Sequence, residues 1–191
     1  MARKPGRKQT KPRVRDSRLY TLQVCLITGP VTEEFAKANP VVSRTIQIRG
    51  DQTLADLHKA IFSAFDRDDE HMYEFQLGGK GPMDPNARRY VLPMVADDPF
   101  DEGWPAGLVD GTPIGSLNLE VNEPFGYWFD FGDDWWHQIN VRAIDAEAPP
   151  GKYPRITERV GESPPQYPDL DDEEDEDLDD EEDSEGADEE A

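Results

Sequence analysis

The most informative segment of the chain reads Phe125-Gly126-Tyr127-Trp128-Phe129-Asp130-Phe131-Gly132-Asp133-Asp134-Trp135-Trp136-His137. More than half of its side chains are aromatic, although aromatic residues make up only 9% of the chain, and three others are carboxylates. Aromatic rings favour burial, whereas carboxylates resist it unless they are paired. The segment therefore indicates either a tight turn that separates the two kinds of residue or a site that both kinds line. We expect a β-hairpin with arms at 125–131 and 136–144, closed by a turn at 132–134.

Two alternating segments and one helical pattern precede this hairpin. Residues 19–28 and 41–49 alternate apolar and polar side chains, which is typical of strands with one face on a core. Thr53 and Asp56 match a capping box, in which two side chains satisfy free backbone amides at the start of a helix. A third strand is expected at 72–77. The helix should bury the apolar residues that recur at helical spacing: Leu54, Leu57, Ile61 and Phe65.

The order of these elements predicts an α+β fold with two strands, one main helix, a third strand, a long connection and a hairpin. Two opening strands followed by one helix across the sheet favour a β-grasp (ubiquitin-like) mixed sheet. Residues 80–115 are rich in Gly, Pro and Asp and show little periodicity, so we expect a long insertion loop there.

Charge divides the chain into three parts. The first 18 residues hold eight Lys or Arg and one acid, and the last 23 residues hold 17 of the 42 Asp and Glu. Neither end has the apolar content to fold, so we expect a disordered basic arm at 1–18 and a disordered acidic tail at 169–191. The domain between them, 19–168, carries a net charge of −12. A body of that sign repels nucleic acid.

The single cysteine and the lack of long apolar runs bear on location. Cys25 excludes an internal disulfide, and its apolar neighbours in the first strand indicate a small buried side chain rather than a nucleophile. No apolar run approaches the ~20 residues that span a bilayer, and no signal-peptide pattern follows the basic arm. These features predict a cytoplasmic protein without a membrane partner.

Four motifs extend over most of the body. They are Thr53-Leu54-Ala55-Asp56-Leu57-His58, His71-Met72-Tyr73-Glu74-Phe75, Phe129-Asp130-Phe131-Gly132-Asp133-Asp134-Trp135-Trp136-His137-Gln138-Ile139 and Gly161-Glu162-Ser163-Pro164-Pro165. Together they resemble the plasmid pRiA4b ORF-3-like family, whose bacterial members are often labelled transposon-passenger or resolvase-like (TnpR-like) proteins. The resemblance implies an association with mobile elements and no defined biochemical activity.

A metal site is the first candidate for chemistry. His58, His71 and His137 lie within these motifs together with Asp130 and Asp134, and imidazole with carboxylate suits zinc, manganese or iron. Their spacing along the chain is long and matches no local ligand pattern. We therefore expect structural roles for the histidines, with no metal and no cofactor. A metal-dependent hydrolase or nuclease that uses this His/Asp cluster is the alternative.

The tryptophans are the candidates for binding. Adjacent residues of a strand point to opposite faces, so Trp135 and Trp136 cannot both enter one core. We predict that one of them is buried and that the other, with Trp128, contributes to a binding surface beside the long loop. Asp130 and His137 should lie at the rim of this concave surface.

The leading hypothesis is a non-enzymatic cytoplasmic module that binds a protein or peptide partner. An exposed tryptophan beside carboxylates suits a peptide or a basic protein. The sequence does not identify the partner, a ligand or an oligomeric state.

Overall fold

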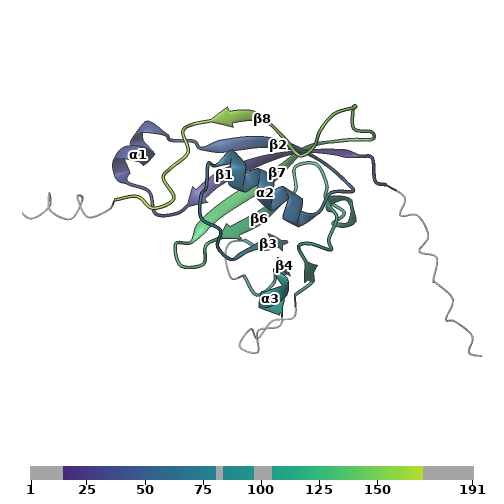
Figure 1. The fold of residues 1–191 in the computed structure, drawn as a ribbon, viewed down its shortest axis with the longest axis horizontal. Helices are drawn as coiled ribbons and strands as arrows, with labels where there is room; N and C mark the ends of the chain where they lie inside the picture. The colour runs from purple at the N-terminus through teal and green to yellow at the C-terminus, as the bar shows by residue number, and fades with distance from the viewer. Residues whose placement is uncertain (1–14, 81–83, 97–104, 170–191) are drawn as a thin grey trace, which may run out of the picture.

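The computed structural model describes residues 15–80, 84–96 and 105–169, and these form one eight-stranded sheet (Figure 1). The order across the sheet is β5-β4-β3-β6-β7-β1-β2-β8. All neighbouring strands are antiparallel except β4 and β5, which are parallel. The strands are β1 (Leu19–Thr28), β2 (Ser43–Arg49), β3 (Tyr73–Leu77), β4 (Arg88–Val91), β5 (Gly107–Leu108), β6 (Pro124–Phe129), β7 (Trp135–Asp145) and β8 (Arg155–Val160).

The main helix, α2 (Leu54–Ala64), crosses one face of this sheet (Figure 1). It begins with the predicted capping box: the Asp56 N–H donates to the Thr53 hydroxyl at 3.2 Å, and the Thr53 N–H donates to the Asp56 carboxylate at 3.0 Å. Leu57 and Ile61 are buried, which confirms the predicted apolar face. The other described helices are short: α1 (Glu33–Ala38), α3 (Pro93–Ala96) and the 3-10 helix η1 (Ile114–Ser116).

The predicted hairpin is strands β6 and β7, and it defines the two faces of the sheet. Trp128 lies directly opposite Trp136 across the two strands. Because neighbours in a strand alternate, Trp135 points to the other face, where it joins the core under α2. The connecting turn begins at Asp130 and ends at Asp134, both with a left-handed backbone at φ 54° and 53°. Aspartate adopts this conformation more readily than most residues, so the turn suits its sequence.

We expected a long loop at 80–115, and this prediction is wrong for the parts of the segment that the structure describes. They contain β4, α3, β5 and η1, and β4 and β5 extend the sheet beyond β3. Tyr90 and Val91 of β4 are buried, and Ile114 of η1 joins the core. Elements of two to four residues are too short to show a hydrophobic period, which is why the sequence pattern did not reveal them.

An α+β fold with a mixed sheet and one main helix is confirmed, whereas this eight-strand order does not confirm the narrower β-grasp arrangement. Residues 15–18 belong to the body rather than to the basic arm. The Asp51 N–H donates to the Asp16 carbonyl at 3.1 Å, and the Gly50 N–H donates to the Arg18 carbonyl at 2.9 Å. The rest of the arm and the tail from residue 170 lie outside the described residues, so their disorder stays a prediction.

Candidate functional site

The first of the three histidines, His58, is held inside the core by α2. Its ring stacks on the ring of Tyr73 with 3.6 Å between centroids. Its Nδ1 lies 2.8 Å from the Tyr127 hydroxyl, and its Nε2 lies 3.4 Å from a carboxylate oxygen of Glu70. Burial lowers the pKa of His58 to about 4, so the ring is neutral near pH 7. A neutral ring with a partner at each nitrogen holds the helix to the sheet.

His137 lies in the core, so its expected position at the rim of a binding surface is wrong. The residue is 1% exposed, and its ring packs edge-on against Phe65 with 4.9 Å between centroids. Neither ring nitrogen has a hydrogen-bond partner among the described residues. Burial, reinforced by the charge of Arg67, lowers its pKa to about 3, against a smaller opposite effect of the nearby backbone of Trp135 and Tyr127. The cause of the burial is strand alternation, since His137 faces the same side of β7 as Trp135.

A buried arginine, Arg67, shares this part of the core and was not singled out from the sequence. Its guanidinium lies over the ring of Trp135, 3.6 Å from the centroid, and its Nη1 donates to the Pro164 carbonyl at 3.4 Å. Burial lowers the pKa of Arg67 to about 10, so it remains charged at neutral pH. The sequence did offer one signal for a special role of Arg67: it is the single basic residue in the Asp-rich segment 66–69 that follows α2.

All three candidate tryptophans are buried, which corrects the expectation of an exposed binding ring. Trp135 is 0% exposed, Trp136 is 9% and Trp128 is 8%. On the face away from α2, the ring of Trp136 covers Gly126, where any added side chain would collide with it. Trp128 donates from Nε1 to the Asp134 carboxylate at 2.9 Å. These contacts stabilise the hairpin.

Residues from three segments meet beyond the end of α2 in a surface that we call the acidic end: Asp69, His71, Asp130, Asp133 and Tyr167. The Nε2 of His71 lies 2.8 Å from the Tyr167 hydroxyl and 3.5 Å from a carboxylate oxygen of Asp130. Tyr167 is 55% exposed. Its hydroxyl pKa is raised, first by desolvation and then by the carboxylates of Asp69, Asp130 and Asp133. The tyrosine therefore lies in a negative field.

Gln166 fixes Tyr167 in place by binding the backbone beyond α2. Its Oε1 accepts from the N–H groups of Asp68 and Asp69 at 3.0 and 3.2 Å, and its Nε2 donates to the Asp69 carbonyl at 2.8 Å. Backbone groups in such a connection need partners, and this one amide supplies three. Tyr167 thus belongs to the folded body.

The histidines and aspartates do not converge on a metal site. His58 bonds to Tyr127 and Glu70, whereas His71 bonds to Tyr167. Within residues 15–80, 84–96 and 105–169, no group of three or more His, Cys, Asp or Glu is arranged to hold a metal ion. The same residues contain no helix with the length and apolar character needed to cross a membrane.

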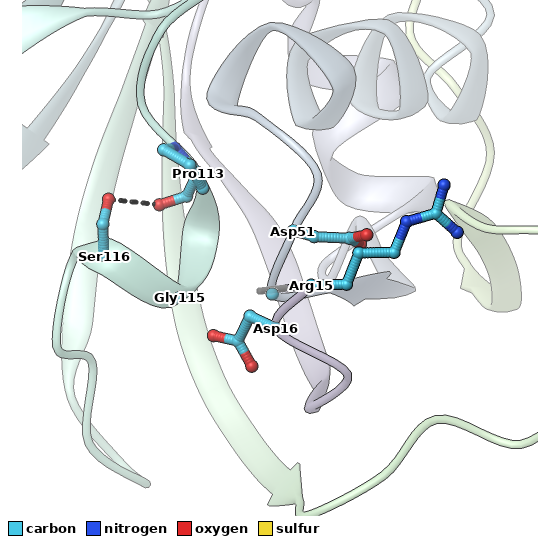
Figure 2. A pocket seen from close by; sticks show the side chains of 7 residues that line it. Arg15, Asp16, Asp51, Pro113, Gly115 and Ser116 are labelled. Atoms are coloured by element: carbon cyan, nitrogen blue, oxygen red, sulfur yellow. Dashed lines mark hydrogen bonds between the residues drawn. The ribbon is translucent and has the colours of Figure 1, made fainter. Parts of the chain in front are cut away.

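A cavity of about 520 Å³ lies near the start of α2 (Figure 2). Both of its carboxylates are already paired, Asp16 with Arg18 at 2.6 Å and Asp51 with Arg49 at 2.9 Å. Its serine hydroxyl donates to a backbone carbonyl of the same wall. The cavity therefore offers no free carboxylate or hydroxyl for catalysis or metal binding. Its lining residues are Arg15, Asp16, Gly50, Asp51, Pro113, Gly115 and Ser116.

Comparison with known proteins gives relatives without an assigned activity. The chain is 28% identical over 131 residues to the uncharacterized protein y4hQ of Sinorhizobium fredii (strain NBRC 101917 / NGR234). That match covers 66% of this chain and 59% of y4hQ, so the chain spans about three fifths of that relative's length. Its fold is similar to the crystal structure of MM3350, a protein of unknown function from Methanosarcina mazei Go1. The TM-score is 0.56 at 23% identity, over 74% of this chain and 69% of that one.

The family model described as plasmid pRiA4b ORF-3-like protein matches residues 32–174. This range contains the main helix, the aromatic hairpin and all of the acidic end. The chain therefore belongs to the plasmid pRiA4b ORF-3-like protein family.

Proposed function

We propose that the protein is a non-enzymatic module that binds a basic protein or peptide at its acidic end. The supporting observation is the exposed ring of Tyr167 among the carboxylates of Asp69, Asp130 and Asp133. Among the described residues, no Lys or Arg forms an ion pair with these three carboxylates. Asp69 is exposed and Asp133 is half-buried, so their charge is available to a partner, while the buried Asp130 contacts His71 and adds to the negative field.

The chemistry of this surface suits a lysine or arginine side chain. A cation placed over the tyrosine ring gains from the ring's negative face, and the neighbouring carboxylates add charge attraction. Met72 follows His71 in the chain and is 45% exposed, and we expect its polarisable side chain to add a contact for the aliphatic part of such a side chain. A basic side chain can therefore make apolar and charged contacts together.

The rival function, a metal-dependent hydrolase or nuclease, would need imidazole and carboxylate ligands within reach of one ion. The described histidines and aspartates lack that arrangement, so the binding module is the better supported function. The family name refers to a plasmid reading frame, and this supports the proposed association with mobile elements. A cytoplasmic location completes the proposal.

The test is the binding of a fluorescent peptide rich in Lys and Arg, followed by anisotropy. Because the acidic tail would itself attract such a peptide, the host is the full-length chain with the acidic residues of 171–183 changed to Asn or Gln. In that host, Tyr167→Ala should weaken binding about tenfold, since a central aromatic contact contributes more than 1 kcal/mol. Tyr167→Phe, which keeps the ring, should retain most of the affinity.

Two methionines provide a matched control. Met72→Ala at the acidic end should weaken binding, whereas Met94→Ala, at a site that is 69% exposed on α3, should leave it unchanged. Equal affinity of the host and its Tyr167→Ala variant would show that the peptide binds elsewhere, and the proposal would then fail.

A further inference from the structure

The face of the sheet turned away from α2 is polar over strands β7, β1, β2 and β8, and we call it the open face. The residues that alternate with those of the open face along each strand point to the other side of the sheet. Ile139 and Val141 are examples, and they belong to the core under α2. Most residues of the open face are exposed or half-buried. The strand registers arrange them in three rows: Gln138-Cys25-Ser43-Val160, Asn140-Gln23-Thr45-Glu158 and Thr21-Gln47-Arg155.

Side chains of the open face bond to one another both along a strand and between strands. Along β7, Gln138 donates from Nε2 to the Asn140 side-chain oxygen at 2.9 Å. Between β8 and β2, Arg155 donates from Nε to the Gln47 side-chain oxygen at 2.8 Å. Arg155 forms no ion pair with a described carboxylate, and its guanidinium also lies over the ring of Tyr153, 4.9 Å from the centroid. These side chains are therefore ordered before any partner binds.

The open face carries arginine and very little acid, although the chain has 42 Asp and Glu. β1, β2 and residues 135–142 of β7 contain no Asp or Glu at all. Arg142 is exposed and has no ion-pair partner among the described residues. Its charge acts on the Cys25 thiol, opposing the rise in pKa that burial causes. Glu158, on the edge strand, is the one acid in the three rows.

We propose that the open face is the docking surface for the chain's own acidic C-terminal tail, residues 170–191. Sixteen of these 22 residues are Asp or Glu. Their charge complements Arg142 and Arg155, whereas the carboxylates of the acidic end repel them. Docking of this kind needs no fixed tail conformation, because many different carboxylates satisfy the same two arginines.

The length of the tail allows it to reach the open face. The described chain ends at residue 169, two residues after Tyr167 of the acidic end, where Gln166 binds the backbone of Asp68 and Asp69. A 22-residue segment reaches up to about 70 Å when extended. Four strands are only about 15–20 Å wide. The covalent link also keeps the tail at an effective concentration of about millimolar, which compensates for weak individual ion pairs.

Two other anionic occupants were weighed against the tail. Nucleic acid is disfavoured because the body itself has a net charge of −12. The tail of a second copy carries the same charge but lacks the concentration advantage of the covalent link. This proposal does not rest on the proposed function, since it concerns another surface and a segment of the chain itself.

The lone cysteine allows a direct test on the full-length chain. Cys25 lies within the open face and is the chain's single cysteine, so it accepts one nitroxide label. In NMR spectra at low salt, we expect the amide signals of residues 170–191 to lose most of their intensity when the label is present. The intensity should return at about 1 M salt, where the screening length is about 3 Å. In the unlabelled chain, the amide signals of Gln138 and Arg142 should shift when the acids of 171–183 are changed to Asn or Gln.

Amino-acid substitutions and a mixture of labelled and unlabelled chains test which surface the tail binds. Arg142→Gln combined with Arg155→Gln should restore the tail signals at low salt. Lys59→Gln, which removes an exposed cation from α2 on the other side of the sheet, should not restore them. Tail signals that keep their intensity beside the label, or that respond to Lys59→Gln instead, would overturn the proposal. Loss of intensity in a mixture of labelled chain with unlabelled, isotope-enriched chain would assign the site to a second copy and would also overturn it.

Discussion

Single residues of this core depart from the usual rule that buried polar groups are paired. The ring nitrogens of His137 are buried and have no hydrogen-bond partner among the described residues. The same is true of the Nε1 of Trp135 and the Nη2 of Arg67. A buried polar group without a partner costs about 1–3 kcal/mol. The neutral state of His137 limits that cost, because a charged imidazolium in the same position would be far less stable.

His137 should make the protein sensitive to mild acid. Its pKa is about 3 when folded and 6.5 in its ordinary state, so the unfolded chain binds a proton more readily between these values. Stability is therefore complete above about pH 6.5 and falls as the pH decreases toward 3. Urea unfolding at pH 7.5 and 5.5 should show a loss of about 1 kcal/mol from this residue. His58, with a folded pKa of about 4, acts in the same direction.

His137→Phe removes the titrating group and keeps an aromatic ring in place. The variant should be as stable as the native chain at pH 7.5 or more so, and it should lose less stability at pH 5.5. His71→Phe is the matched control at a more exposed histidine, and it should leave the effect of His137 in place. An unchanged difference between the two pH values in His137→Phe would refute the assignment.

At the scale of elements, the hairpin and the helix divide the work of stabilising the sheet. β7 presents Trp135 and His137 to α2 and presents Trp136 to the opposite face. One strand therefore contributes aromatic rings to two separate packing layers. The helix contributes its apolar stripe to one of these layers, which is why its loss should affect the whole sheet.

Leu57→Ala tests the packing of α2. The side chain is 0% exposed, and its truncation should lower the free energy of unfolding by about 2–5 kcal/mol through lost burial and the resulting cavity. Urea unfolding measures the change. Lys59→Ala, on the exposed side of the same helix, should change stability by less than about 0.5 kcal/mol. Similar effects of the two substitutions would contradict the orientation of the helix.

At the scale of the whole molecule, charge is distributed over separate surfaces. Acidic residues gather in the C-terminal tail and at the acidic end, while the strands of the open face are almost free of them. The net charge of −22 is therefore a sum over surfaces of different charge, and it does not give the charge of any one surface of the body. For this reason the proposed basic partner and the proposed docking of the acidic tail use different faces of the domain.

A chain reduced to residues 15–169 tests how far the two ends contribute to stability. At about 0.15 M salt or above, where charges beyond about 8 Å are screened, its Tm should lie within about 2 °C of the full-length value. Residues 15–18 are retained because they bond to the body. Calorimetry in the same buffer gives the comparison, and a loss of several degrees would mean that the ends pack tightly on the domain.

The sequence by itself determined the elements with a long, clear pattern. The capping box and apolar stripe of α2, the alternation of β1 and β2, the aromatic hairpin and the family all follow from residues close together in the chain, where local geometry governs spacing. The sequence also showed that Trp135 and Trp136 must face opposite sides. It could not show that both sides are covered, because burial depends on segments distant in the chain.

Tertiary structure alone decided where the exposed chemistry lies. Tyr167 meets His71 and Asp130 because Gln166 binds the backbone after α2, a contact between residues nearly a hundred positions apart. The short strands β4 and β5 form by pairing with β3 and with each other rather than by their own pattern. Such contacts depend on which surfaces the whole chain brings together, and that information is not contained in the spacing of neighbouring residues.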